Sequence, residues 1–154
     1  KNAKDFYYFS DEYFTKLSDI IIKNGWCITA NIGSELIGFA IFLNYNKKSS
    51  YHLSSTTDVK KYPGITNSII KKAVEIAQSD GFKSINLGGG NASDKKDSLF
   101  RFKLKMANKE NNFFICKKIL DKKAHKNILE YWKKEFPQLD QKYKHYLQCY
   151  RLIN

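Results

Sequence analysis

The sequence predicts an α+β fold, in which helices flank a mixed, mainly antiparallel sheet in the order helix-βββ-α-β-α-β-α. Three strand-like runs follow one another closely, as in an antiparallel meander. A run with helical periodicity then links the third strand to a fourth, as in a right-handed parallel crossover. Hydrophobic residues make up 42% of the 154 residues and aromatic residues 15%, enough for a globular core. We therefore expect one domain over residues 1–154.

The first elements are a helix and three strands. Ser10 can cap the helix and Gly25 can end it. Its apolar stripe comprises Phe14, Leu17, Ile20 and Ile21. The strands WCITANI and ELIGFAIFLN follow, and the second is apolar almost throughout, as expected for a strand that is covered on both faces. The run YHLSSTT then supplies the third strand.

The later elements alternate between helices and strands. Residues 65–79 have a clear helical pattern that Gly81 ends. The strand KSINL and a GGGN loop come next, and Ser98 can cap a helix over residues 98–107. The run NFFICKKIL alternates as a late strand. A helix that ends near Pro137 and a further helical stretch in LDQKYKHYL complete the order.

The composition limits the classes of partner. A net charge of +12 favours nucleic acid, anionic membrane or phosphorylated ligands, although lysines spread over a solvated surface would give the same number. The cysteines and histidines show no zinc spacing, so we expect no metal site and interpret the cysteines as buried thiols. No apolar run approaches the roughly 18 residues of a membrane span, and the first residues lack the order of a secretory signal. We expect a cytoplasmic protein; the initial Lys is compatible with a longer parent protein.

Two loops are candidates for a ligand cleft. The first precedes the helix at residue 65, whose free N–H groups and dipole would favour an anion. The second is Gly88–Gly90, which would leave room for a ligand or a neighbouring backbone, and Asn91 beyond it could bond an acceptor. A plain turn is the alternative for this second loop. Asn67, in the first turn of the helix, could cap it or bind a ligand.

The third strand carries a polar face. Strand alternation places His52, Ser54 and Thr56 on one side, which predicts a substrate groove. The ordinary pKa of histidine lies near neutrality, so His52 could act as a general base. A histidine hydrogen-bonded inside the sheet is the alternative.

The order of these motifs resembles the GNAT N-acetyltransferase fold over nearly the whole chain. More closely, it is similar to the C-terminal GNAT-like half of FemAB-type peptidyltransferases and related double-GNAT acyltransferases. The resemblance rests on SELIGFAIFLNYNKKSSYHLSSTT, on ITNSIIKKAVEIAQSDGFKSINLGGG and on LFRFKLKMA. In the last segment Phe102-Lys103 match the family's FK pair, whereas Met106-Ala107 stand where Phe-Gly is usual.

The resemblance implies an acyl- or aminoacyltransferase that acts on an amine. In acyl-CoA-dependent relatives a glycine loop at this helix start holds the pyrophosphate; here it would comprise Lys61, Gly64, Ile65, Thr66 and Asn67. Pro63 lacks an N–H donor, and Thr66 stands where a small residue is usual. FemAB-type relatives instead use aminoacyl-tRNA as donor and a cell-wall precursor as acceptor.

In the FemAB-type branch the FK lysine is implied to stabilise the oxyanion, which assigns that role to Lys103. Phe102 would line the substrate site or the core and fix how Lys103 is aimed. The alternative for Lys103 is a solvated residue of an amphipathic helix. Two other functions stay open: a non-catalytic half that binds an acceptor, a missing N-terminal half or a second copy, and an RNA-binding module that uses its lysines for tRNA.

Overall fold

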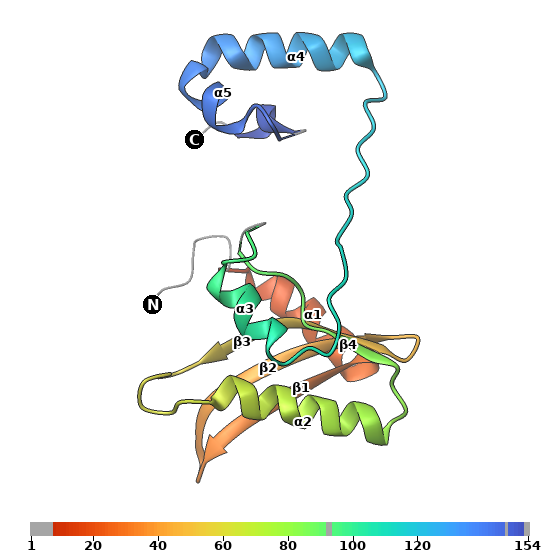
Figure 1. Cartoon of the computed structure of the whole chain (residues 1–154), viewed down its shortest axis with the longest axis vertical. Coiled ribbons are helices and arrows are strands. Elements are labelled where there is room, and N and C mark those ends of the chain that lie inside the picture. Colours follow the sequence, from red (N-terminus) through yellow and green to blue (C-terminus); the bar gives the residue numbers. More distant parts are fainter. Residues whose placement is uncertain (1–7, 92–93, 147, 153–154) are drawn as a thin grey trace. The chain divides into compact units, whose positions relative to one another are not determined.

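The computed structural model describes residues 8–91, 94–146 and 148–152, and these fall into two compact units, Lys1–Glu110 and Asn111–Asn154 (Figure 1). The first unit contains a four-stranded sheet in the order β1-β2-β3-β4. Strands β1 (Gly25–Ile32), β2 (Glu35–Tyr45) and β3 (Lys48–Thr56) pair antiparallel, and β4 (Ser84–Asn86) pairs parallel to β3. The predicted fold class, a mixed and mainly antiparallel sheet with flanking helices, is confirmed.

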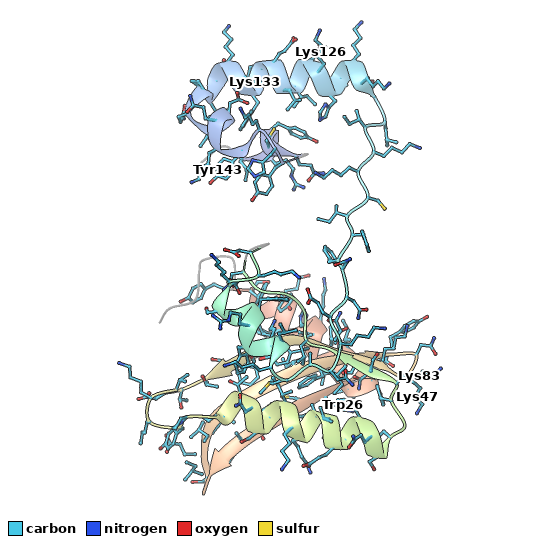
Figure 2. The ribbon with its side chains drawn as sticks, viewed as in Figure 1. Trp26, Lys47, Lys83, Lys126, Lys133 and Tyr143 are labelled. Carbon is cyan, nitrogen blue, oxygen red and sulfur yellow. The ribbon has the colours of Figure 1, made fainter. Side chains whose placement is uncertain are left out.

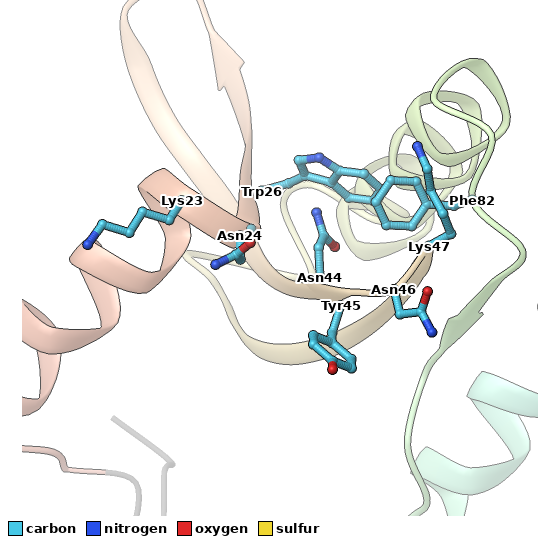
Figure 3. Close-up of a pocket in the computed structure, with 9 residues that line it drawn as sticks. Lys23, Asn24, Trp26, Asn44, Tyr45, Asn46, Lys47 and Phe82 are labelled. Atoms are coloured by element: carbon cyan, nitrogen blue, oxygen red, sulfur yellow. The ribbon is translucent and has the colours of Figure 1, made fainter.

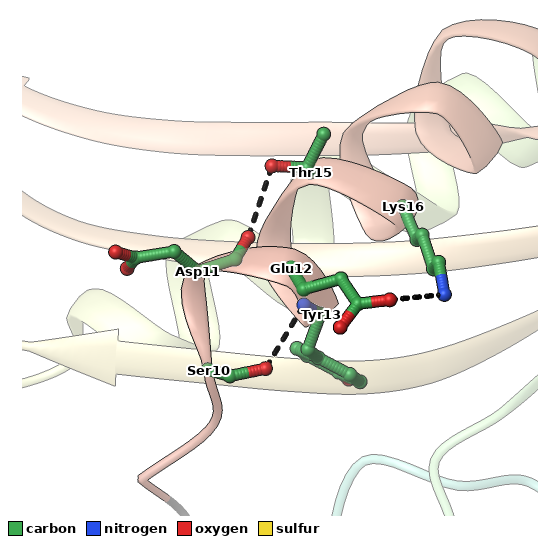
Figure 4. A network of polar contacts seen from close by, with 6 residues as sticks. All are labelled: Ser10, Asp11, Glu12, Tyr13, Thr15 and Lys16. Carbon is green, nitrogen blue, oxygen red and sulfur yellow. Dashed lines mark hydrogen bonds and ion pairs between the residues drawn. The ribbon is translucent and has the colours of Figure 1, made fainter.

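Helix α1 (Asp11–Asn24) begins as the sequence predicts. The Ser10 hydroxyl accepts the backbone N–H of Tyr13 at 3.3 Å, and Glu12 forms an ion pair with Lys16 one turn later at 2.6 Å (Figure 4). Strand β1 follows the helix directly. A Cβ on Gly25, at this junction, would lie 2.9 Å from Ile21 Cα and 2.8 Å from the carbonyl oxygen of Phe42. A glycine is therefore needed where α1 turns into the sheet.

Helix α2 (Ile65–Ser79) connects β3 to β4 and covers the face of the sheet opposite α1 (Figure 1). The helix contributes its buried positions to the main core, together with side chains of β1 and β2. The members of this core are Ile28, Ile37, Ala40, Phe42, Ile65, Ile69 and Ala73. The N-cap of α2 is Gly64, in the left-handed region at φ 86°, and no side chain caps the helix. The expectation that Asn67 could cap α2 is therefore wrong.

Helix α3 (Ser98–Leu104) is shorter than the predicted 98–107 and is capped one residue earlier. The Asp97 carboxylate, rather than Ser98, accepts a backbone N–H, that of Phe100, at 2.8 Å. A carboxylate is the better cap here because its charge also interacts with the positive end of the helix dipole.

The second unit is helical. It contains α4 (Lys122–Glu135), α5 (Pro137–Tyr143) and the 3₁₀ turn η2 (Cys149–Arg151). Side chains of α4 and of the segment after α5 meet in its interior, as Figure 2 shows, and Trp132 there donates its indole N–H to the carbonyl of Leu152 at 2.7 Å. Leu147, the last residue of the predicted LDQKYKHYL helix, lies outside the described residues.

The predicted late strand NFFICKKIL is not present as a strand: residues 111–120 pair with no strand in the part of the chain that the structure describes. Alternation identifies a segment that could bury one face, but a strand forms only where a second backbone completes its hydrogen bonds. Phe113 and Phe114 are accordingly 88% and 80% exposed. The expectation of buried cysteines is wrong for Cys27 and Cys116, which are exposed, while Cys149 is buried.

Within the described residues, no helix is both long enough and apolar enough to cross a bilayer.

The contact between α2 and β2 allows a stability test at Gly38. A Cβ there would lie 2.8 Å from Ile65 Cγ2 and 3.3 Å from the carbonyl oxygen of Ser55. We expect Gly38→Ala to lower the free energy of unfolding by about 1–3 kcal/mol, because the first turn of α2 must shift away from the sheet. Urea unfolding measures this change.

Gly89→Ala is the matched control, because a Cβ on Gly89 meets no described atom within 4 Å. Equal loss of stability in the two variants would contradict the proposed close contact.

Candidate functional site

Strands β3 and β4 separate after a short parallel pairing. Their register joins Lys48–Ser50 to Ser84–Asn86 only, whereas β3 continues to Thr56. The chain after β4 turns away through Gly88, at φ 72°. Among the described residues, the later part of β3 therefore has one edge without a partner strand. Backbone N–H and C=O groups along such an edge are free to bond an extended ligand.

A β-bulge at His52 changes which side chains share a face. Ile41 is opposite Leu53 and Phe42 is opposite Tyr51, so His52 is the extra residue. Residues directly opposite in a sheet point to the same face, and Phe42 belongs to the core under α2. Tyr51 therefore lies on the α2 face, where its hydroxyl donates a hydrogen bond to Ser54 Oγ.

The predicted groove of His52, Ser54 and Thr56 is therefore wrong as a single face. Ser54 is opposite Ala40, a core residue under α2, and Thr56 is opposite Gly38, which α2 contacts. Simple alternation failed because the bulge adds one residue to β3 and shifts the pattern by one position.

His52 is directed toward α1. Its Nε2 lies 2.7 Å from the hydroxyl of Tyr13, and the His52 side chain is exposed. The His52–Tyr13 pair is accessible on the α1 face of the sheet, whereas the preceding residue, Tyr51, lies on the α2 face. The sequence analysis missed Tyr13, because a lone tyrosine beside an apolar helical stripe gives no functional signal.

Lys103 lies where β3 and the chain after β4 separate. From α3 its ammonium donates to the carbonyl oxygen of Gly89 at 2.9 Å and lies 5.6 Å from the centre of the Tyr51 ring. Burial lowers the pKa of Lys103, and the negative charge of Asp97 partly opposes this effect. The ammonium is thus fixed by contacts from two sides and partly removed from water.

The glycines after β4 have different roles. A Cβ on Gly90 would collide with the Asp97 side chain and lie 2.9 Å from Phe100 Cβ, so Gly90 allows α3 to pack against the loop. Gly89 has open space beside it. Asn91 is exposed and Phe102 is half-buried, and no described hydrogen bond links either of them to Lys103.

The loop before α2 has an internal carboxylate. Asp58 accepts the backbone N–H groups of Lys60 at 2.8 Å and Lys61 at 3.0 Å, so one donor of the predicted anion loop, that of Lys61, is occupied. The N–H groups of Ile65 and Thr66, in the first turn of α2, have no partner among the described residues. These two donors follow Gly64, on which a Cβ would meet no described atom within 4 Å.

Lys61 lies close to this helix start but interacts with its neighbour. Its ammonium is 4.8 Å from the centre of the Tyr62 ring, and the interaction with the Tyr62 side chain raises the pKa of Lys61. Lys61 is therefore a positive charge at the side of the α2 start.

The contact at Gly90 generates a test of how Lys103 is held. We expect Gly90→Ala to displace the Asp97 cap, loosen α3 and raise the pKa of Lys103 toward its ordinary value as the ammonium gains water. NMR titration of the lysine ammonium measures this pKa. An unchanged Lys103 pKa in a folded Gly90→Ala protein would show that the loop does not position the lysine, and Gly89→Ala serves as the control.

No protein-family model and no curated protein sequence matches the chain. Solved structures do. A ribosomal-protein-alanine N-acetyltransferase from Brucella melitensis biovar Abortus 2308 is similar over 73% of this chain and 83% of its own, with a TM-score of 0.52 and 13% identity. An aminoglycoside acetyltransferase from an uncultured soil metagenomic sample is similar over 77% and 80%, with a TM-score of 0.53 and 14% identity. A transcriptional regulator from Bacillus halodurans C-125 is similar over 72% and 77%, with a TM-score of 0.53 and 21% identity. At identities this low the similarity establishes the fold alone, and the chain has the α+β fold of the GNAT acetyltransferase structures.

Proposed function

We propose that the protein is an acyl- or aminoacyltransferase of the GNAT/FemAB-like group, which moves an acyl group from an activated carrier to an amine. The observation that carries this proposal is the Lys103 ammonium, held 2.9 Å from Gly89 O at the point where β3 and β4 separate. Two of the solved structures that share the fold are acetyltransferases, which supports a reaction of the same class.

The chemical step needs an electrostatic group and a proton acceptor. The amine nitrogen attacks the carbonyl carbon of the carrier, and the carbonyl oxygen becomes an oxyanion. The Lys103 ammonium stabilises that charge without transferring its proton. Collapse of the intermediate breaks the bond to the carrier, which leaves as a thiolate or a ribose alkoxide. The amine loses its proton to a base, and the exposed His52, the residue after Tyr51 in β3, is the candidate.

The carrier would bind on the α2 face. The N–H groups at Ile65 and Thr66 and the charge of Lys61 are suited to a phosphate of coenzyme A or of tRNA, with Gly64 and Asn67 alongside. The unpaired edge of β3 would bond the amide groups of an acyl-CoA arm. The internal bonds of Asp58 reduce the number of free donors, which favours a carrier held at few phosphate contacts.

The acceptor would bind on the α1 face, opposite the carrier. Ser54 and Thr56 line the carrier side of β3, and His52 lines the α1 side. Asn91 and Phe102 would border the acceptor from the loop and from α3. A small amine and the amine of a cell-wall precursor are the two acceptors to test, and the FK pair at Phe102-Lys103 supports the second.

A Lys103 variant tests the catalytic assignment. We expect Lys103→Ala to lower turnover about 100-fold, as loss of an oxyanion donor does, while the thermal unfolding midpoint stays close to that of the parent protein. Transfer from acetyl-CoA and from aminoacyl-tRNA to a panel of amines measures turnover. Lys105→Ala is the matched control, because Lys105 is an exposed lysine at the end of the same helix. Equal turnover in the Lys103→Ala and parent proteins would remove Lys103 from the mechanism.

The pH dependence has a defined sign. Because burial lowers the pKa of Lys103, the ammonium is lost at a pH below the ordinary lysine value of 10.5. We expect turnover to fall in that alkaline range, and Lys103→Arg to move the fall to higher pH because the guanidinium does not deprotonate there. A profile of kcat against pH that is identical in the two proteins would contradict the role of the ammonium.

Calorimetry with acetyl-CoA tests the carrier site. We expect saturable binding that weakens about tenfold in a Lys61→Ala/Thr66→Ala variant, which loses one charged contact to phosphate. Lys71→Ala, on the exposed surface of α2, is the control. Binding that is equal in both variants would exclude the α2 start as the carrier site. Absence of binding to the folded protein would leave aminoacyl-tRNA as the carrier to test.

A second candidate function is a non-catalytic half that docks a partner domain or a second copy. The exposed apolar segment at Phe113, Phe114 and Ile115 favours it, because contiguous apolar surface of this kind marks interaction sites. This candidate predicts no turnover by the parent protein with either carrier, so the Lys103 assay distinguishes the two functions.

A further inference from the structure

Residues 111–120 form a segment whose large apolar side chains lie in solvent. Besides Phe113 and Phe114, Ile115 is 70% exposed and Leu120 is 87% exposed. Because the segment pairs with no described strand, no sheet covers these side chains. Single exposed apolar residues are normal on a protein surface, but a run of this density is typical of a surface that meets a membrane or another macromolecule.

The second unit, to which this segment belongs, is strongly basic. Residues 111–154 carry ten lysine and arginine side chains against four acidic ones, so half of the net charge of +12 falls on this unit. Lys117 and Lys118 lie inside the apolar run, and Lys122 and Lys123 follow it at the start of α4. All four lysines are exposed, and none forms an ion pair with a described residue.

The carboxylates near the run have other partners. Asp121 caps α4 by accepting the backbone N–H of Ala124 at 2.8 Å, and Glu130 lies 3.7 Å from the ammonium of Lys126. The sequence has no acidic residue over 111–120. The positive charge beside the exposed apolar side chains is therefore not neutralised locally.

A small hollow of about 230 Å³ connects the segment with the helical part of the unit. Lys117 of the segment, His125 of α4, and Lys144 and Tyr146 from the chain after α5 are among the residues that line it. Two lysines from separate parts of the sequence thus lie at one place, next to the exposed ring of Tyr146. The unit gathers lysines beside apolar side chains and does not spread them evenly.

Helix α4 has the same combination of side chains. Ile128 and Tyr131 are exposed on it, and they lie in the sequence between Lys126 and Lys133, which Figure 2 shows on this helix. A basic helix with exposed apolar side chains is typical of proteins that lie on a membrane surface.

The side chains distinguish between three kinds of partner. Nucleic-acid bases stack on flat rings, which Ile115, Ile119 and Leu120 do not offer, and arginine, the better residue for phosphate recognition, occurs in residues 111–154 only at Arg151. A second copy would bring the same unneutralised lysines against this surface and repel it. An anionic bilayer suits both features, because its acyl chains take up apolar side chains and its phosphates attract lysines.

We propose that residues 111–123 dock the protein on the surface of an anionic membrane. The side chains of Phe113, Phe114 and Leu120 enter the boundary between headgroups and acyl chains, and Lys117 and Lys118 bind lipid phosphates. The backbone of the segment stays at the depth of the headgroups, where water completes the hydrogen bonds that hydrocarbon would leave unmade. The protein lies on the bilayer and does not span it, and the inference does not depend on the acyl-transfer reaction.

Vesicle sedimentation tests the proposal on the full chain. The probes are vesicles of phosphatidylcholine alone and vesicles that contain about one quarter phosphatidylglycerol, an anionic lipid. We expect binding to the anionic vesicles to be at least about tenfold tighter, and to weaken as the salt concentration rises.

Two double variants separate the contributions of charge and apolar surface. We expect Lys117→Gln/Lys118→Gln to weaken binding to the anionic vesicles about tenfold, because two contacts to the charged surface are lost. We expect Phe113→Ser/Phe114→Ser to weaken it about tenfold as well, because two rings no longer leave water. Circular dichroism confirms the fold of each variant.

The matched controls lie on the first unit. Tyr45 is 86% exposed, and Lys23 and Lys48 are exposed lysines. Figure 3 shows the Tyr45 and Lys23 side chains directed away from Trp26 and Phe82, two residues of a pocket at the end of the sheet. We expect Tyr45→Ser and Lys23→Gln/Lys48→Gln to bind the anionic vesicles as tightly as the parent protein.

A tryptophan at position 114 reports insertion. We expect brominated acyl chains to quench the fluorescence of Phe114→Trp more strongly than that of Tyr45→Trp, since only the first tryptophan enters the bilayer. Both variants keep Trp26 and Trp132, so the comparison isolates the added ring.

Absence of vesicle binding by the folded protein would overturn the proposal, as would equal affinity for the two kinds of vesicle. So would binding that survives both double variants, or equal quenching of the two added tryptophans. Binding of single-stranded RNA without vesicle binding would make the surface a nucleic-acid interface instead. A dimer that Phe113→Ser/Phe114→Ser dissociates in analytical ultracentrifugation, again without vesicle binding, would make it an interface between copies.

Discussion

The first unit depends on the packing of α2 against the middle of β2. Because Gly38 has no side chain, Ile65 can lie directly on the sheet, and Ile69 and Ala73 continue the same contact over Phe42 and Ala40. Burial of this apolar surface fixes where the helix begins and therefore where its free N–H groups lie. It also fixes where the chain returns to the sheet, so the position of β4 beside β3 follows from the same contact.

The candidate site arises from two departures from a regular sheet. The bulge at His52 turns Tyr51 toward α2 while His52 bonds Tyr13 on the other side. The short pairing of β3 with β4 leaves a gap that the Lys103 side chain bridges to Gly89. A carrier on one face and an acceptor on the other would meet at this gap.

Much of the fold could be predicted from the sequence, because apolar periodicity reports which face of an element is buried. Residues 65–79 were predicted as a helix with its observed limits. The strands β1, β2 and β4 were located to within about one residue, whereas β3 begins three residues before the predicted Tyr51. The segment 112–120 was predicted wrongly, since alternation carries no information on whether a pairing strand is present. For the site, the FK pattern indicated Lys103, but not its contact with Gly89 or Tyr51. The bulge at His52 has no local sequence signal, and the Tyr13 contact joins residues 39 positions apart.

The contact between Gly90 and the α3 cap couples the loop to the lysine mechanically. Asp97 caps α3 and also packs against Gly90, while Lys103 returns from the other end of the helix to the carbonyl of Gly89. The loop, the cap and the lysine thus form a closed ring of short contacts. A ligand that pushes the Gly89 carbonyl aside must also move the ammonium, so ligand entry and alignment of the charge are one motion and not two successive events.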